Sequence, residues 1–277
     1  MFQLGAHTFG FVWQKDASAA FEAIAAAGFR QVQLMASPPH FNPWRADAPR
    51  TARLRKILEA SGLSLLALDL ASSDINLASA APEVVDFAVD AYIRTIQRAA
   101  ELGAPWVCIG SGRRHALLAL ANDRLMDTFR PAFARIHAEA ERRGVRLILE
   151  NHPQGLLPGA ADMRDFLARE GYADLPVIYD VANAVAIGED PADGIATLQG
   201  RIGIVHLSDS PKGVWRHDAI GTGEIDFTAI HAALTRADYD GHVVLEILSD
   251  DAMAGLTDGV RRLSATGWNF AEGLTST

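Results

Sequence analysis

Short apolar segments alternate with longer helix-like segments along the chain, and this alternation limits the possible folds more than any other feature. Eight of the short segments are rich in Val, Ile and Leu and show little alternation of polar and apolar residues. Such continuous apolar runs are typical of strands that are buried on both faces of a parallel sheet. The predicted strands cover residues 2–7, 31–36, 63–69, 105–110, 145–150, 176–180, 202–207 and 242–247.

A helical pattern follows each predicted strand. These patterns cover residues 16–28, 51–62, 82–103, 124–144, 160–170, 190–199, 226–237 and 250–268. Pro131 lies inside the fourth pattern and is expected to kink that helix or to start it afresh. Strict alternation of eight strands and eight helices predicts an α/β protein, a (β/α)₈ TIM barrel that spans residues 1–277 as a single domain. The competing fold is a doubly wound open sheet, which would suit about six strand–helix units better than eight. The first strand–helix turn also lacks the glycine-rich dinucleotide fingerprint of that fold.

Charge and composition exclude several classes of protein. The net charge of −9 opposes binding to nucleic acid or to an anionic membrane surface. The N-terminus lacks the pattern of a signal peptide, and no stretch approaches 18 apolar residues. Cys108 is the only cysteine, which is compatible with a reducing compartment. We therefore expect a cytoplasmic protein with a small-molecule partner, while a homo-oligomer is left open.

Four consecutive predicted strands, the fifth to the eighth, each carry a metal-competent side chain at the carboxyl end. These residues are Glu150, Asp180, His206 and Glu246. The carboxyl ends of barrel strands meet at one rim, so three carboxylates and one imidazole are expected to lie together there. They would repel one another unless a cation held them. Oxygen-rich ligation with one nitrogen favours Mn²⁺, Mg²⁺ or Co²⁺ over structural zinc. Any one of these carboxylates could instead cap a helix or a loop.

Other polar residues near this rim are candidates for contact with a substrate. His152 lies two residues beyond Glu150 and therefore on the same side of an extended backbone. His217 and Arg216 lie in the long loop after the seventh strand, and His7 ends the first strand. For each histidine, a capping or surface role remains an equal alternative. Five further histidines are interpreted as surface or core residues, namely His40, His115, His137, His231 and His242.

Aromatic residues gather in the predicted rim loops and could form the wall of a carbohydrate pocket, because sugar faces pack on aromatic rings. They are Trp13, with Phe9, Phe11, Phe41, Trp44 and Trp215. The segment GTGE (221–224) is interpreted as a turn that leads to Asp226 at a helix N-cap. Lys212 and Arg216 are the only obvious cations in the loop after the seventh strand, which argues against a phosphorylated substrate. Arg113 and Arg114, after the fourth strand, argue the other way.

Several motifs resemble those of the sugar phosphate isomerase/epimerase family within the xylose isomerase-like barrels. The matching segments are LILENH, YDVANA, VHLSD, GTGEIDF and VVLEI, and the resemblance covers essentially the whole chain. It implies that Glu150, Asp180, His206 and Glu246 bind one divalent ion, with Mn²⁺ expected and Mg²⁺, Co²⁺ or Zn²⁺ as alternatives. It also implies that Glu150 and Glu246 act as acid and base on opposite sides of the substrate.

The resemblance implies a metal-dependent isomerase or epimerase that acts on a ketose or a related polyol ketone through an enediolate. A dehydratase of the inosose or 3-dehydroshikimate type is the alternative, because loss of a β-hydroxyl can follow from the same enediolate. The chain departs from many relatives at Asn183, where they have histidine, and at Gln33, near which they often have glutamate. Asn183 can still bind a substrate hydroxyl. Endonuclease IV shares the barrel but needs three zinc ions, and Asn183 and Trp215 stand where it needs histidine and aspartate.

Overall fold

The computed structural model describes residues 1–45, 48–71, 75–115, 117 and 120–271. Its centre is a closed ring of eight parallel strands in sequence order, sealed by pairing of β8 with β1 and of β1 with β2. The strands are β1 (Phe2–His7), β2 (Gln31–Ala36), β3 (Ser64–Leu70), β4 (Trp106–Gly110), β5 (Arg146–Glu150), β6 (Val177–Asp180), β7 (Ile202–Leu207) and β8 (His242–Leu245). A short strand that was not predicted, β9 (Phe270–Ala271), pairs with the start of β1. The predicted barrel is confirmed.

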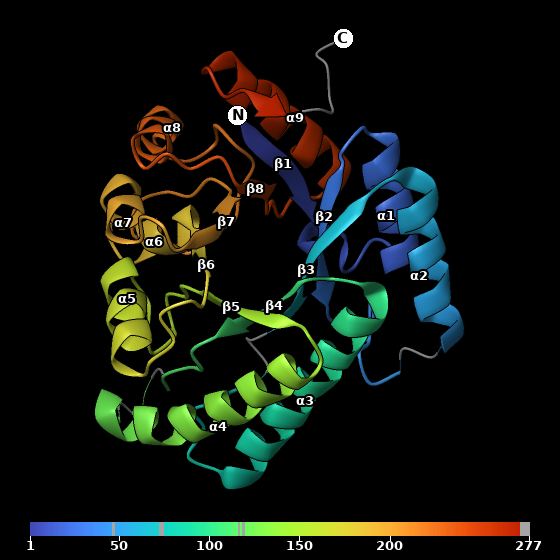
Figure 1. Cartoon of the computed structure of the whole chain (residues 1–277). Helices are drawn as coiled ribbons and strands as arrows, with labels where there is room; N and C mark the ends of the chain where they lie inside the picture. The colour runs from blue at the N-terminus through green and yellow to red at the C-terminus, as the bar shows by residue number, and fades with distance from the viewer. Residues whose placement is uncertain (46–47, 72–74, 116, 118–119, 272–277) are drawn as a thin grey trace.

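Helices surround the ring (Figure 1). They are α1 (Ala17–Ala26), α2 (Ala48–Ser61), α3 (Pro82–Leu102), α4 (Asn122–Arg142), α5 (Ala160–Arg169), α6 (Val181–Ala186), α7 (Pro191–Thr197), α8 (Phe227–Arg236) and α9 (Ala252–Ala265), with a 3₁₀ turn, η1 (Phe9–Phe11). Each predicted helix is present within a few residues of its expected bounds. Helix α4 runs on through Pro131 and does not start afresh there. Asp226 caps α8, as the sequence predicts.

The period of two along each strand divides the side chains between the inside of the barrel and the layer under the helices. The inner apolar cluster consists of Leu66, Ala67, Cys108, Ile148, Ile178, Ile204 and Val244. Four of these residues stand two positions before Glu150, Asp180, His206 and Glu246, respectively. The four polar side chains therefore project from the same inner face, one layer nearer to the carboxyl rim.

Helix α6 is the main element that the sequence pattern did not predict. It begins directly after β6, because the Asp180 carboxylate accepts a hydrogen bond of 2.6 Å from the backbone N–H of Asn183. This N-cap turns the chain sharply at the rim. The segment VANAVA is too short and too uniformly apolar to show a helical period, so it could not be distinguished from the end of the strand.

His40 is a buried core histidine, and it leads to a prediction about stability. Its Nδ1–H donates to the Lys15 carbonyl at 2.6 Å, and burial lowers the pKa of His40 from its ordinary value of 6.5. Below pH 6.5 the unfolded chain takes up a proton that the folded chain excludes, so the free energy of unfolding should fall on acidification by up to about 1.4 kcal/mol per pH unit from this group. In His40→Asn, chemical denaturation between pH 7.5 and 5.5 should show a smaller fall than in the wild type. Equal slopes would contradict the prediction.

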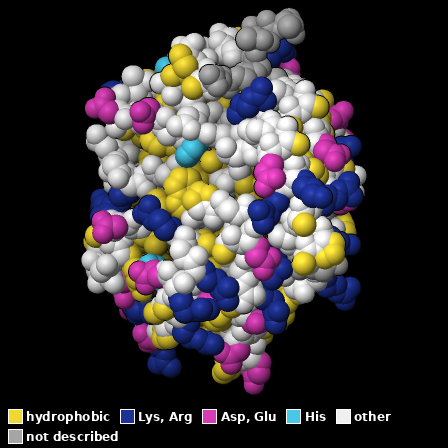
Figure 2. All heavy atoms as spheres, turned by 45° about the vertical axis from the view of Figure 1, so that its right-hand side comes forward, with side chains coloured by type: hydrophobic (Ala, Val, Ile, Leu, Met, Phe, Trp, Pro, Cys, Tyr) yellow, Lys and Arg dark blue, Asp and Glu magenta, His cyan; other side chains and the backbone are white. Residues whose placement is uncertain are grey.

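None of the described helices is long and apolar enough to cross a membrane. On the face shown in Figure 2, basic and acidic side chains are interspersed. Such mixing produces no strong field of one sign on that face.

Candidate active site

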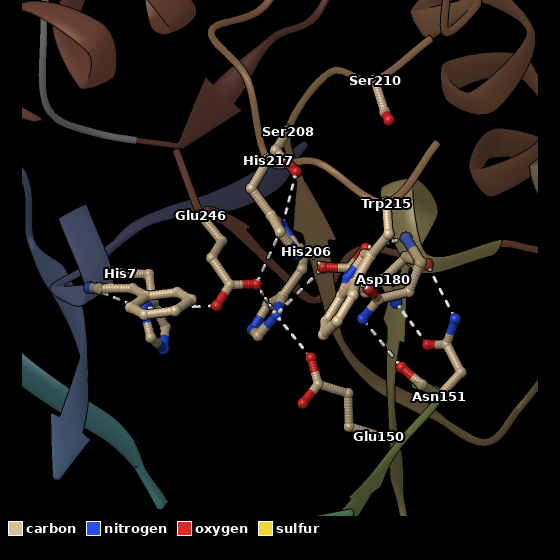
Figure 3. A network of polar contacts seen from close by, with 12 residues as sticks. His7, Glu150, Asn151, Asp180, His206, Ser208, Ser210, Trp215, His217 and Glu246 are labelled. Atoms are coloured by element: carbon tan, nitrogen blue, oxygen red, sulfur yellow. Dashed lines mark hydrogen bonds and ion pairs between the residues drawn. The ribbon is translucent and has the colours of Figure 1, made fainter. Parts of the chain in front are cut away.

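Four strand ends bring the predicted ligand groups together at the carboxyl rim. One oxygen or nitrogen from each of Glu150, Asp180, His206 and Glu246 lies within 4.8 Å of all the others. His206 Nδ1 is 3.1 Å from Glu246 Oε2, 3.2 Å from Glu150 Oε1 and 3.7 Å from Asp180 Oδ2. Figure 3 shows the two glutamates approaching His206 from two sides.

The environment of these groups fits a bound cation. Asp180 Oδ2 and His206 Nδ1 are buried and have no hydrogen-bond partner. Burial, with added repulsion from Glu246 and Glu150, raises the pKa of Asp180 to about 7. The neighbouring His206, His7 and His217 outweigh burial at Glu246 and hold its pKa below the usual range. Unpaired buried groups of this kind are costly, and a divalent ion would supply the missing partner for all four side chains.

A buried hydrogen-bond chain fixes the orientation of the His206 ring. A carboxylate only accepts hydrogen bonds, so the Gln33 amide N–H₂ faces Asp69 Oδ2, at 2.6 Å. The Gln33 carbonyl oxygen must then face His206 Nε2, 3.0 Å away, and Nε2 donates to it. Nδ1 is therefore the ring nitrogen that faces the three carboxylates and would bind an ion there. The carboxylates of Glu246 and Glu150 outweigh burial and raise the pKa of His206 well above its usual value, so a bound ion would take the place of the Nδ1 proton.

Loss of the Gln33 side chain should therefore weaken metal binding without removing a ligand. In Gln33→Leu, we expect Mn²⁺ affinity to fall by about 10- to 100-fold, because His206 loses the group that holds its ring. The free energy of unfolding should also fall by about 1–3 kcal/mol, since Asp69 and His206 lose a buried partner. Calorimetric titration and urea unfolding would measure the two effects.

Gln31→Leu is the matched control for this prediction. Gln31 lies on the same strand, and its side chain bonds to Gln3 and His242 at the opposite end of the barrel. This variant should lose stability but keep its metal affinity. Unchanged affinity in Gln33→Leu as well would show that the Gln33 hydrogen bond does not position His206.

His7 lies beneath the pocket and not on its wall. Its Nε2 donates to Asp69 Oδ2 at 2.5 Å, while its Nδ1 accepts from the backbone N–H of Phe9 at 3.0 Å. Nδ1 also lies 3.7 Å from Glu246 Oε1. The side chain is fully buried. Both ring nitrogens thus have partners within the protein, and the structure does not bring His7 to a position where it would touch a substrate.

A second group of hydrogen bonds connects the ends of β5 and β6 to the β7–α8 loop. The Asn151 amide donates to the Asp180 carbonyl at 2.9 Å and accepts from the Asp180 N–H at 2.8 Å. Asn183 Nδ2 donates to the Asn151 carbonyl at 2.9 Å, and Asn183 Oδ1 accepts from Trp215 Nε1 at 2.7 Å. Asn183 does line the pocket, but its amide group is engaged in holding Trp215.

The other predicted contact residues line a cavity of about 520 Å³ above the ligand group, namely Trp13, His152, Arg216 and His217. His217 Nδ1 is 3.0 Å from Ser208 Oγ and 3.7 Å from both Asp180 Oδ2 and Glu246 Oε2, so it borders the ligand group. Burial, followed by the charge of Arg113, lowers the pKa of His152 to about 4. His152 is therefore neutral at pH 7 and suited to hydrogen-bond a hydroxyl group.

The aromatic residues predicted for the wall divide into two groups. Phe9, Trp13 and Trp215 line the cavity. Phe11 and Phe41 are buried in the core between strands and helices, and Trp44 stacks on Phe87. The sequence pattern does not specify which aromatic rings of the rim loops face the cavity and which pack elsewhere.

Asp69 is a pocket residue that the sequence interpretation did not single out. It lines the cavity, and its Oδ1 is buried without a hydrogen-bond partner. The signal was present, because Asp69 is the last residue of the predicted third strand, 63–69. Applying the strand-end rule to that strand would have found it. Cys108 also lines the cavity, with Sγ 3.3 Å from Glu150 Oε2.

The fold and the ligand group define the class of this protein, a parallel (β/α)₈ barrel with a candidate metal site at its carboxyl rim. The family model of the xylose isomerase-like TIM barrel matches residues 21–266. The chain therefore belongs to that family, as its motifs predict.

Individual relatives include proteins with different activities. A 2-epi-5-epi-valiolone 7-phosphate 2-epimerase of Actinoplanes sp. is 30% identical over 75% of this chain and 73% of its own length. A probable endonuclease 4 of Solibacter usitatus is 28% identical over 84% of this chain and 86% of its own length. The crystal structure of a D-tagatose 3-epimerase-like protein superposes with a TM-score of 0.80 at 21% identity, covering 95% of this chain and 97% of that one.

Proposed function

We propose that this protein is a divalent-metal-dependent epimerase or isomerase of a ketose or a related polyol ketone. One observation carries the proposal. Of the four ligand groups, Glu150 and Glu246 line the cavity, whereas Asp180 and His206 lie beneath its wall. Two carboxylates thus reach the space that a substrate would fill, which suits a dual role as ligands and as acid and base.

The proposed reaction is a proton transfer at the carbon next to the carbonyl group. One glutamate carboxylate takes the proton, and the electron pair of the broken C–H bond forms the double bond of an enediolate. The other glutamate returns a proton to the opposite face, which inverts that carbon. If the proton were instead returned to the neighbouring carbon, the reaction would interconvert an aldose and a ketose. A bound divalent cation would supply stabilisation of the enediolate charge.

The donor set suits a hard divalent ion. Three carboxylates and one imidazole would hold it, and Mn²⁺ is our first choice, with Mg²⁺, Co²⁺ or Zn²⁺ as alternatives. Neutral His152, at the wall, would orient a substrate hydroxyl, and Asp69 could accept a second one.

Two other activities make different predictions. A dehydratase would use the same first proton transfer but release water from the neighbouring position. A nuclease of the endonuclease IV type would need further zinc ligands. In the described residues, Asn183 and Trp215 are hydrogen-bonded to each other, and one group of His, Cys, Asp and Glu side chains is close enough to hold an ion. The epimerase relative and the wall glutamates favour the epimerase.

Solvent exchange tests the proposal directly. The Mn²⁺-loaded protein would be incubated in D₂O with a panel of ketoses, ketoglycosides and inososes, followed by NMR and mass spectrometry. We expect deuterium at the carbon next to the carbonyl, together with an epimer or an aldose. Loss of 18 mass units would instead identify a dehydratase. Absence of exchange across the whole panel would refute both, and three tightly bound zinc ions per chain would support the nuclease.

A further inference from the structure

The cavity above the ligand group has more room than a simple monosaccharide requires. Its volume of about 520 Å³ lies within the range of pockets that hold drug-sized ligands, roughly 300–1,000 Å³. Its polar inner end contains Glu150, Glu246, Asp69 and His152. These groups suit the hydroxyl and carbonyl groups of one sugar ring, so the remaining volume lies toward the mouth.

The rest of the wall is largely apolar. Its apolar residues are Phe9, Val12, Trp13, Met35, Leu70, Trp215 and Leu248, of which three are exposed at the mouth. Trp13 is 85% exposed, Leu248 39% and Trp215 37%. Large apolar side chains that gather at the mouth of a polar pocket are typical of a surface that is covered by a ligand.

Trp215 is held in place before any ligand arrives. Its indole N–H donates to Asn183 Oδ1 at 2.7 Å, and its ring lies edge-on to His152 with ring centroids 4.6 Å apart. Asn183 is in turn anchored to the Asn151 carbonyl, so the ring is a fixed platform that loses little entropy on binding.

The charges of the wall disfavour a phosphate group. Among the described residues that line the cavity, Asp69, Glu150, Asp218 and Glu246 are acidic, and Arg216 is the only Lys or Arg. The Arg216 guanidinium is already paired with Asp218, at 2.9 Å. Arg113 and Arg114 lie outside this wall, and hydrogen-bond to Gln154 and to the Leu156 carbonyl, respectively.

We infer that the substrate is an unphosphorylated keto sugar that carries an apolar, planar substituent, such as the aglycone of an aryl glycoside. The sugar ring occupies the inner polar end, and the substituent packs between Trp13 and Trp215 at the mouth. This inference rests on the proposed function, because it assigns the inner end to the reacting sugar. It goes further in naming the part of the substrate that the outer wall recognises.

A matched set of ligands tests the inference. The set comprises the methyl and phenyl glycosides of one 3-ketohexopyranose and the 6-phosphate of the methyl compound. We expect kcat/KM for solvent deuterium exchange to be at least about tenfold higher for the phenyl than for the methyl glycoside, because only the phenyl ring buries area against the indoles. The phosphate should be the poorest of the three. Equal values for methyl and phenyl glycosides, or a preference for the phosphate, would overturn the inference.

Two variants test whether Trp13 causes the preference for the phenyl glycoside. In Trp13→Ala the ratio of phenyl to methyl kcat/KM should fall to about threefold or less, because one of the two walls is lost. Phe87→Ala removes another partly exposed aromatic ring, on α3 and outside the cavity, and should keep the ratio of the wild type. An unchanged ratio in Trp13→Ala would show that Trp13 does not contact the substituent.

Calorimetry separates this inference from the proposed function. If none of the three compounds exchanges deuterium, their affinities for the Mn²⁺-loaded protein can still be compared. Binding of the phenyl glycoside at least about tenfold more tightly than the methyl glycoside would support the substrate class even though the reaction is different. Equal affinities would reject the substrate class, whatever the reaction is.

Discussion

Glu246→Gln should abolish conversion of one epimer into the other, with a fall of about 10³-fold or more in rate at saturating Mn²⁺. The glutamine oxygen can still face the ion, but the amide cannot take or return a proton, and a positioned acid or base contributes about 10²–10⁴-fold. The conversion would be followed by NMR with metal content measured in the same sample. Glu246 lies at the cavity wall and 3.1 Å from His206 Nδ1, so this residue is placed both to bind the ion and to act as acid or base.

The same variant can show which face of the substrate each glutamate serves. Deuterium exchange begun from each epimer separately should be lost from one and partly retained from the other, because Glu150 still serves its own face. Glu59→Gln, the same chemical change on the exposed surface of α2, is the matched control and should leave the rate unchanged. Conversion within tenfold of the wild-type rate, with the ion still bound, would show that Glu246 is not the acid or base.

Asp180→Asn should lower the affinity for Mn²⁺ by about 10²- to 10⁴-fold. The change removes the negative charge of a fully buried side chain, and loss of one partner from a buried ionic site costs about 3–5 kcal/mol. Asparagine can still accept the hydrogen bond from the Asn183 N–H that begins α6, so the fold at the rim should persist. Isothermal titration, or the electron paramagnetic resonance signal of free Mn²⁺, measures the affinity.

Asp190→Asn is the control for this experiment, because Asp190 caps the next helix, α7, in the same way but lies outside the ligand group. Its metal affinity should equal that of the wild type. If Asp180→Asn bound Mn²⁺ as tightly as the wild type, Asp180 would not be a ligand, and the ion would have to be held by the remaining three groups.

The local pattern of the chain was sufficient to predict the barrel and the ligand group. Parallel strands that close into a ring place all their carboxyl ends at one rim, so the last polar residue of each strand predicts a position in space. The rule needs only the identity of strand ends. It would also have located Asp69, at the end of the third strand.

Contacts between distant segments could not be predicted in this way. Gln33 and His206 are 173 residues apart, and they meet because the ring closes between β8 and β1, so that only these two strands separate β7 from β2. Asn183 and Trp215 are 32 residues apart, and their hydrogen bond depends on the path of the β7–α8 loop. The departures at Gln33 and Asn183 were visible in the sequence, but their partners were not.

The sequence by itself therefore determined the order of strands and helices and the four ligand types at the rim, because both depend on short-range periodicity. The tertiary structure alone decided which of these groups face the cavity, which aromatic rings form its wall, and which ring nitrogen of His206 faces the carboxylates. These properties depend on register, ring closure and loop paths, through which side chains far apart in the chain come within hydrogen-bonding distance.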